Sequence, residues 1–304
     1  MGKTRIYILL LLGVIANAGI AQQQAMFTQY MFNAVAINPG VVGTHKSMSI
    51  TALLREQWVG IEGAPSTQTL SVHSPLLNDK IGLGLLFVRD EIGITRQNSI
   101  FGAYAYRVDF GFATLSMGLQ AGFSDYRSNQ SELNPNNPDM TLDEDFNSGL
   151  KPNFGTGAYL YSDRFYVGAS APMLINHNFF DENSEQKNDQ RKHYFLMAGY
   201  VFPLNNSLML KPNILFKAVQ GAPMELDLNA NLLIEQIIWV GVSYRSFDSV
   251  DALLELQVNE QLRVGYAHDF TTSDLRKVNR GTHELMVNYV FAFKNKKTIT
   301  PRYF

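Results

Sequence analysis

The chain has 304 residues, of which 46% are hydrophobic, 12% aromatic and 17% charged, with a formal net charge of -2 and no cysteine. The near-neutral charge argues against a nucleic-acid-binding surface, and the missing cysteine excludes disulfides, thiolate metal sites and cysteine nucleophiles. The charged fraction is below the roughly 25% of an average soluble domain, yet no apolar run after residue 20 approaches the about 20 residues of a membrane-spanning helix. This combination is typical of a membrane β-barrel, whose strands expose only half of their residues to lipid.

The first 21 residues have the pattern of a secretory signal peptide. Two basic residues lie within the first five positions, a short apolar core covers residues 6–15, and Gly19 and Ala21 place small residues before the predicted cut. We predict cleavage after Ala21, with cleavage after Ala18 as the alternative. An uncleaved anchor helix fits less well, because the apolar core is short. The protein is therefore expected to be exported to the outer membrane of a Gram-negative cell.

Residues 22–46 are expected to form a short periplasmic lead-in that tucks into the barrel mouth, or a plug. Residues 26–33 are aromatic and mixed, which suits a short helix, and Asn38-Pro39-Gly40 is expected to end that helix.

From Ser47 onward the hydrophobic pattern changes to a period of two. Apolar side chains occupy every second position in residues 112–124, and in residues 224–232 and 250–258 they alternate mainly with Glu, Asp, Asn and Gln. Such alternation predicts strands with one apolar and one wet face. Soluble β-sandwiches share this pattern, so alternation by itself does not indicate a membrane.

The lengths of the connections decide between a sandwich and a membrane barrel. We predict fourteen strands, near residues 47–57, 67–75, 80–89, 97–108, 111–125, 152–162, 164–171, 192–202, 206–218, 222–234, 237–246, 249–258, 260–270 and 282–293. The even-numbered connections are short, and the long ones are all odd-numbered, at residues 58–66, 126–151, 172–191 and 271–281. Outer-membrane barrels combine short periplasmic turns with longer outer loops. The sequence thus predicts an all-β, transmembrane, antiparallel up-and-down barrel over residues 47–293, followed by a periplasmic tail over residues 294–304.

Aromatic residues near the predicted strand ends are expected to form girdles at the two membrane interfaces. They include Tyr104, Tyr106, Phe110, Phe112, Phe123, Tyr126, Tyr159, Tyr161, Phe165, Tyr166, Tyr200, Phe202 and Trp239.

Charges of both signs fall on the polar faces of the later strands. They are Lys211, Lys217, Glu225, Asp227, Asp251, Glu255 and Arg263. If the apolar faces meet lipid, these side chains point into the lumen, where an unpaired charge is costly, so we expect pairing or hydration. A structural charge network in a plugged or narrow barrel is the first interpretation. A solute channel lined by selective charges is the second.

We predict no enzyme, no cofactor and no metal ion. His268 and Asp269 come closest to a catalytic dyad, but no spacing among the six histidines requires them to converge with a nucleophile. The long loop of residues 126–151 carries four acidic residues, Asp139, Asp143, Glu144 and Asp145. It lacks the glycine-centred spacing of a calcium loop. We interpret it as a solvated acidic loop, with calcium or partner binding as alternatives.

Three long motifs resemble the PorP/SprF family of outer-membrane proteins from Bacteroidota. They are Phe27-Thr-Gln-Tyr-Met-Phe-Asn33 with Ile37-Asn-Pro-Gly40, the run from Arg55-Glu-Gln-Trp-Val-Gly to Val72-His-Ser-Pro75, and the run from Pro152-Asn-Phe-Gly to Phe165-Tyr-Val-Gly168. The resemblance covers nearly the whole mature chain, although Gly40-Val-Val-Gly43 departs from the wording usual there. It implies a component of the type IX secretion and gliding machinery that works with periplasmic subunits and supports export or surface anchoring of a secreted adhesin. No catalytic residue comes with the family.

The expected partners are a secreted adhesin or cargo protein, the periplasmic subunits and the lipid bilayer, without nucleic acid. Candidate partner-binding residues lie in an outer loop, with Trp58, Gly60, Gly63 and Pro65 forming a rigid rim, and in the acidic loop. The tail residues Arg302, Tyr303 and Phe304 would dock a partner on the periplasmic side, and a disordered tail is the alternative. A porin-like solute channel remains the alternative function, and it depends on an open lumen.

Overall fold

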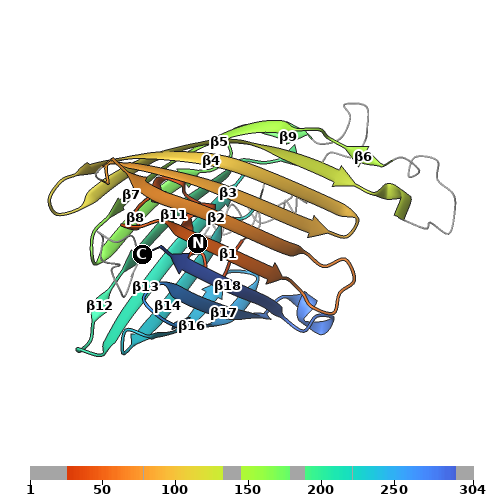
Figure 1. The fold of residues 1–304 in the computed structure, drawn as a ribbon. Helices are drawn as coiled ribbons and strands as arrows, with labels where there is room; N and C mark the ends of the chain where they lie inside the picture. The colour runs from red at the N-terminus through yellow and green to blue at the C-terminus, as the bar shows by residue number, and fades with distance from the viewer. Residues whose placement is uncertain (1–25, 78, 133–144, 179–188, 221, 292–304) are drawn as a thin grey trace, which may run out of the picture.

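The computed structural model describes residues 26–77, 79–132, 145–178, 189–220 and 222–291, and its main sheet closes into a barrel (Figure 1). The fourteen strands of the wall are β1 (Ser49–Glu56), β2 (Ser66–Leu76), β3 (Ile81–Ile92), β4 (Thr95–Asp109), β5 (Thr114–Ser128), β7 (Lys151–Tyr161), β8 (Phe165–Ala171), β11 (His193–Tyr200), β13 (Leu208–Val219), β14 (Glu225–Ile234), β15 (Ile238–Arg245), β16 (Ser249–Gln257), β17 (Leu262–Thr271) and β18 (Thr282–Val290). Each coincides with one predicted strand, so the predicted fold is confirmed.

All wall strands pair antiparallel with their neighbours in the chain, and the first strand closes the sheet onto the last. The closing register places Ser49 of β1 opposite Val290 of β18, and Glu56 opposite His283. A closed sheet leaves no free edge, which matters in lipid because the bilayer core offers no partner for an exposed backbone N–H or C=O.

The remaining elements are short and are not among the fourteen strands of the wall. They are β6 (Phe146–Asn147), β9 (His177–Asn178), β10 (Asp189–Gln190), β12 (Phe202–Pro203) and the 3-10 helices η1 (Ala34–Ala36), η2 (Pro39–Val41), η3 (Gln130–Glu132) and η5 (Asp274–Lys277). Across the described ranges, no helix has the length and apolar character needed to cross a membrane.

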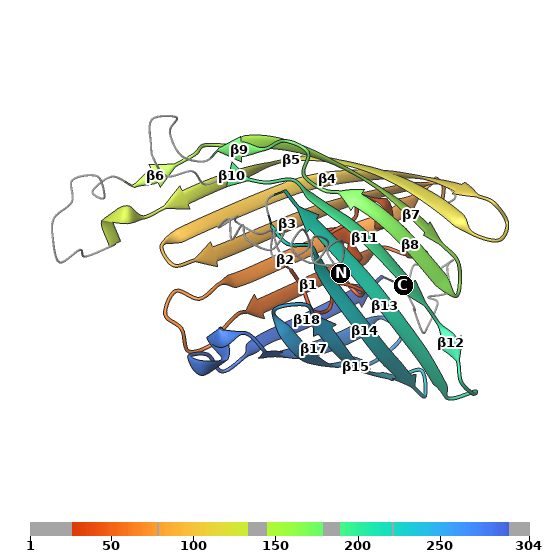
Figure 2. The same cartoon turned by 180° about the vertical axis from the view of Figure 1, so that it is seen from behind.

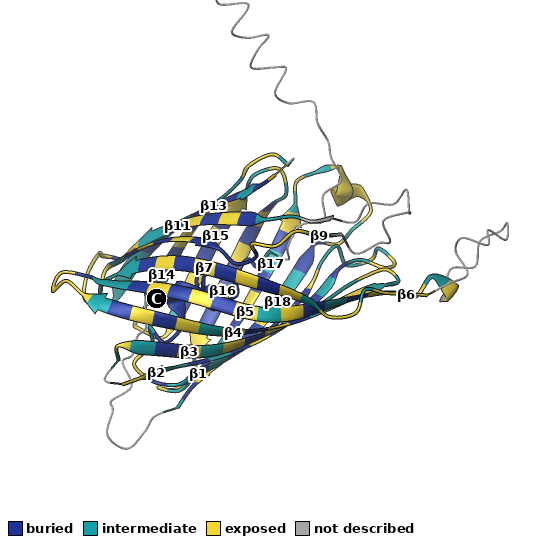
Figure 3. Cartoon of the chain, turned by 90° about the horizontal axis from the view of Figure 1, so that it is seen from above, coloured by how far each residue is buried: buried dark blue, intermediate teal, exposed yellow. Residues whose placement is uncertain are grey.

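Buried and exposed residues alternate along the strands of the wall (Figure 3). The exposed positions are mostly apolar, and many of the buried positions are polar or charged. In β16, for example, Val250 and Leu254 are exposed while Asp251 and Glu255 are buried. A water-soluble barrel shows the reverse arrangement. An exposed apolar face is stable when hydrocarbon surrounds it, as in an outer-membrane barrel.

Some of the aromatic residues predicted for the girdles point into the barrel instead. Tyr126, Tyr159, Tyr166 and Trp239 are all buried. Tyr159 stacks on Tyr166 with ring centroids 5.5 Å apart, and Trp239 packs on Phe32 at 5.8 Å. The prediction was wrong for these four, because it counted distance from a strand end and not the face on which each ring lies.

The N-terminal segment, defined here as residues 26–46, lies inside the barrel (Figure 2). It forms turns over residues 28–32 and two 3-10 helices after them, so the short helix predicted for residues 26–33 is wrong. Asn38-Pro39-Gly40 begins η2 rather than ending a helix, because the Asn38 side chain accepts a 2.8 Å hydrogen bond from the Gly40 N–H. The segment starts at Met26 near the end of the barrel that carries the long connections, called the outer end below. It reaches β1 at the opposite, short-turn end.

Candidate functional site in the lumen and outer mouth

A buried ion cluster lies where the first strand meets the last two. Arg55 of β1 pairs through Nη2 with Asp269 of β17 at 2.7 Å and through Nη1 with Glu284 of β18 at 3.0 Å. All three side chains are almost fully buried. The closure of the barrel produces this cluster, because it places Arg55 directly opposite Glu284.

The cluster binds the beginning of the N-terminal segment. The backbone N–H groups of Thr28 and Gln29 donate to the Glu284 carboxylate at 2.9 and 2.8 Å. The Thr28 hydroxyl donates to Asp269 at 2.8 Å, and Arg55 donates to that hydroxyl oxygen at 3.0 Å. Because a buried charge without partners is strongly destabilising, the segment and the wall stabilise one another here.

At β5 and β7, a different part of the wall packs closely against the N-terminal segment. A Cβ atom added at Gly118 of β5 would overlap Pro39, and one added at Gly157 of β7 would overlap Asn38. The Asn38 amide donates to the backbone carbonyl of Ala158 at 3.1 Å. The two glycines therefore provide the space in which η2 lies against the wall.

The predicted lumen charges all lie on the inward faces of their strands, buried except for the half-buried Glu225. Most form ion pairs. Lys217 pairs with Glu225 at 3.2 Å, and Arg263 pairs with Glu255 at 3.0 Å.

Two other predicted lumen residues contact side chains that were not among the predicted lumen charges. Lys211 lies 5.1 Å from the centroid of the Phe32 ring and 5.7 Å from that of Trp239. Asp227 is paired with Arg245 of the next strand at 3.1 Å. Ion pairs and ring contacts, together with the N-terminal segment, thus occupy much of the inward surface of these strands.

Several charged residues of the lumen were missed by the sequence analysis, and they include the ones that bind the segment. They are Arg55, Asp90, Arg245, Asp248, Asp269 and Glu284. The alternation in β18, where Glu284 occupies the same face as Met286 and Asn288, was a usable signal. The predicted barrel made β1 and β18 neighbours, but no local pattern indicated that Arg55 would lie opposite Glu284.

The loop between β1 and β2 is tied to the loops on both of its sides. Its Val59 N–H donates to the Gly281 carbonyl at 2.9 Å, and its Gly63 carbonyl accepts from the Gly93 N–H at 2.9 Å. Gly63 has a φ of 71° and a close backbone contact with Gly93, which together disfavour a larger residue. Trp58 and Gly60 also have positive φ. The loop residues predicted to bind a partner therefore belong to a rim that is braced, in that hydrogen bonds fix it to both neighbouring loops.

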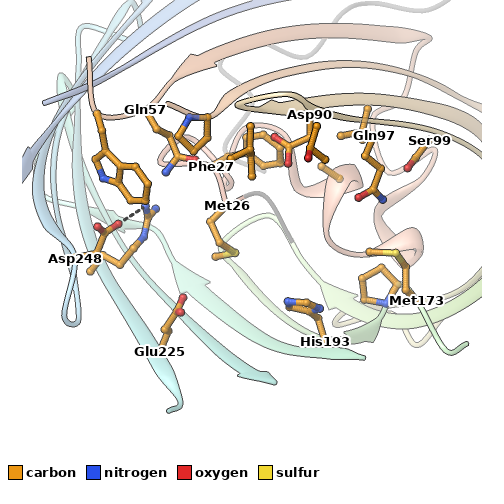
Figure 4. A pocket seen from close by; sticks show the side chains of 18 of the residues that line it. Met26, Phe27, Gln57, Asp90, Gln97, Ser99, Met173, His193, Glu225 and Asp248 are labelled. Atoms are coloured by element: carbon orange, nitrogen blue, oxygen red, sulfur yellow. Dashed lines mark hydrogen bonds and ion pairs between the residues drawn. The ribbon is translucent and has the colours of Figure 1, made fainter. Parts of the chain in front are cut away.

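A cavity of about 630 Å³ opens inside this rim (Figure 4). The first residues of the N-terminal segment, Met26 and Phe27, form its floor. Two of the predicted residues, Trp58 and Pro65, line it. The lining also includes Glu225, one of the predicted lumen charges. The cavity therefore extends from the rim to the outermost of these charges.

Asp145 of the acidic loop does not line this cavity. Asp145 accepts hydrogen bonds from the backbone N–H and the hydroxyl of Ser131, at 3.0 and 2.8 Å. These bonds hold the pKa of Asp145 below its ordinary value. Asp139, Asp143 and Glu144 lie outside the described residues, as do the signal peptide and Arg302, Tyr303 and Phe304.

The only predicted near-dyad does not assemble. Asp269 faces the lumen and is bound to Arg55, while its neighbour His268 occupies the other face of β17 and stacks on Phe270 with ring centroids 4.5 Å apart. Within the described part of the chain, no group of three His, Asp or Glu residues is placed to hold a metal ion.

Several known proteins are similar to this chain. Among solved structures, the chain is similar to a KdgM porin (TM-score 0.38, 11% identity, 80% of this chain and 99% of that one) and to a Pseudomonas aeruginosa FadL homologue (TM-score 0.45, 11% identity, 81% and 89%). It is also similar to a Rhodopseudomonas blastica porin mutant (TM-score 0.33, 11% identity, 81% and 99%). No curated protein matches the chain. The model of a family described as type IX secretion system membrane protein PorP/SprF matches residues 19–289, and the chain belongs to that family.

Proposed function

We propose that this outer-membrane barrel is a plugged scaffold that supports the export or surface anchoring of a secreted adhesin-like partner at its outer mouth. The observation that carries the proposal is the binding of the N-terminal segment to separate parts of the lumen wall. Glu284 binds the segment at Thr28 and Gln29, and the glycines of β5 and β7 receive it at η2. A segment held in this way restricts passage through the lumen.

The charges of the lumen support a structural role in preference to conduction. A selective channel needs charged groups that exchange partners with passing ions. Here Lys217, Arg245 and Arg263 are buried and already form ion pairs with carboxylates on the wall. The proposal includes no catalysis.

Partner binding would take place on the two exposed ends of the barrel. On the outer side, the braced rim around Trp58 and Pro65 offers a preformed surface. On the periplasmic side, we propose that the tail with Arg302, Tyr303 and Phe304 contacts the subunits of the secretion machinery.

Conductance in planar bilayers tests the plug. We expect no steady current from the full-length protein and a steady current from a variant that lacks residues 27–42. Heat-modifiable migration on gels reports whether the shortened barrel still folds. A steady current from the folded full-length protein would favour the second candidate, a porin-like channel, for which the inward charges are the motivating observation.

A cell-surface measurement tests the export role. We expect deletion of the gene to remove one or a few secreted proteins from the surface proteome, and expression of the full-length chain to restore them. Purification of the barrel from native membranes should recover such a protein with it. An unchanged surface proteome would contradict the proposal.

A further inference from the structure

The outer cavity has two chemically different walls. On one wall, β3 and β4 place the apolar side chains of Leu86, Val88 and Phe101 beside the polar side chains of Asp90, Gln97 and Ser99. The opposite wall carries Glu225 and Arg245. In Figure 4, Met26 and Phe27 lie between these walls. A ligand that fills this space must present an apolar surface and tolerate charged groups on one side.

The rim of the cavity exposes large apolar side chains to water. Phe247 of the β15–β16 connection is 77% exposed and Leu275 of η5 is 38% exposed, and both line the cavity. Met224, which follows the cavity residue Pro223, is 70% exposed. These residues belong to connections at the outer end and not to the lipid-facing wall. Apolar groups gathered around an opening in water are typical of a site for another molecule.

The tip that carries Phe247 is held in an unfavourable backbone conformation. Phe247 has a φ of 66°, which is uncommon for a bulky residue. The neighbouring Ser246 is fixed by a 2.9 Å bond from its N–H to the Leu226 carbonyl, and its hydroxyl accepts from the Leu226 N–H at 2.8 Å. These two hydrogen bonds fix the turn, and the turn holds the Phe247 ring at the rim of the cavity.

One carboxylate of the cavity has no cation to balance it. Glu225 is paired with Lys217, and Asp248 is paired with Arg245 at 3.4 Å. Asp90 on β3 accepts a hydrogen bond from the Thr67 hydroxyl at 2.5 Å, and the described residues place no lysine or arginine in an ion pair with it. The cavity therefore has one anionic position available, on a wall that carries no other charged lining residue.

We propose that this cavity is the docking site for a segment of the secreted partner in which a lysine or arginine lies within three residues of large apolar side chains. The basic group would pair with Asp90, and the apolar groups would pack on Phe27, Trp58 and Phe247. This proposal rests on the proposed function, since it identifies the part of the partner that the barrel holds.

Site-specific photocrosslinking in the native cells tests the docking site. The photoreactive residue p-benzoylphenylalanine replaces Phe247 at the rim or, as a control, Leu119 on the lipid-facing surface of β5. We expect the probe at position 247 to crosslink to a secreted protein, and mass spectrometry to place the crosslinks in one contiguous segment with the stated chemistry. The probe at position 119 should not give this product.

A charge variant then tests the role of Asp90. We expect Asp90→Asn to lower the yield of the crosslink about tenfold, because a charge-assisted contact is lost. The matched control is Asp163→Asn, which removes an exposed carboxylate from a short turn at the other end of the barrel and should leave the yield unchanged.

Three outcomes would overturn the docking site. They are crosslinks scattered over many proteins, a crosslinked segment without a basic residue, and equal yields for the two asparagine variants. If no crosslink forms at position 247 while a secreted protein still depends on the barrel for surface display, the docking proposal fails and the proposed function stands. If surface display does not depend on the barrel, the proposed function fails independently.

Discussion

Two regions of the lumen wall hold the same N-terminal segment by different means. At β1, β17 and β18, three buried charges bind backbone N–H groups and the Thr28 hydroxyl. At β5 and β7, glycines leave the space that Pro39 and Asn38 occupy. The first region depends on every partner being present, because each deletion leaves a buried charge unsatisfied. The second depends on the absence of a Cβ atom. Substitutions in the first region should therefore cost more than those in the second.

The largest effect is expected from Arg55→Ala. This change leaves Asp269 and Glu284 buried without their cation, which costs about 3–5 kcal/mol of unfolding free energy. Urea unfolding in lipid vesicles, followed by tryptophan fluorescence, measures the loss. The control is Arg127→Ala, since Arg127 forms a 2.8 Å pair with Asp125 but is 58% exposed. A surface pair of this kind contributes at most about 1 kcal/mol. Equal losses for the two variants would contradict the role of the buried cluster.

A smaller loss is expected from Thr28→Val, which keeps the shape of the side chain and removes its hydroxyl. Asp269 and Arg55 each lose a hydrogen bond to the segment, and a bond to a charged group contributes about 1.5–3 kcal/mol. Thr28→Ser should restore most of the stability in the same unfolding assay. If Thr28→Ser is as unstable as Thr28→Val, packing of the methyl group and not hydrogen bonding holds this position.

In the glycine region, Gly118→Leu should displace η2, with a cost of about 1–3 kcal/mol for overpacking. The chain has no cysteine, so Ala34→Cys gives a single thiol whose labelling rate reports the displacement. We expect faster labelling when Gly118→Leu is added. Gly102→Leu is the matched control, because Gly102 lies on the exposed face of β4 and an added Cβ atom would have no neighbour closer than 3.9 Å. Unchanged labelling with Gly118→Leu would show that η2 does not depend on that space.

The smallest effect is expected in the exposed loop, where Ser131 holds Asp145. The folded pKa of Asp145 lies below its ordinary value of 3.8, so the contact stabilises the loop above that value and is lost as the pH falls through the lower folded value. Hydrogen exchange at the Ser131 amide should accelerate as the pH falls through this lowered pKa. Asp145→Asn should remove this dependence. Exchange that is independent of pH, after correction for the intrinsic rate, would contradict the contact.

The strands were predictable because their signal is local. A strand with one lipid face and one wet face has a period of two within eight to ten residues, as in β16, where Val250 and Leu254 alternate with Asp251 and Glu255. The inward position of the predicted charges followed from the same alternation. The alternating lengths of the connections then indicated a membrane barrel.

The contents of the lumen were not predictable, because they depend on contacts between distant residues. Thr28 and Glu284 are separated by 256 positions, and they meet only because β1 closes on β18. The N-terminal segment has turns and 3-10 helices without a repeating pattern, so nothing in it indicated where it would lie. The inward rings of Tyr166 and Trp239 were misplaced for a related reason, since they pack with partners from other parts of the chain.

The sequence by itself determined the class of fold, the number of strands and which face of each strand meets lipid, because lipid selects apolar side chains at every second position. Long motifs also indicated the family. Only the tertiary structure decided what fills the barrel, since closure brings Arg55, Asp269 and Glu284 around Thr28. It also decided that Trp58, Asp90 and Phe247, from three separate connections or strand ends, share one cavity at the outer mouth. Those contacts depend on the register of the closed sheet and on the path of the N-terminal segment, which no local pattern specifies.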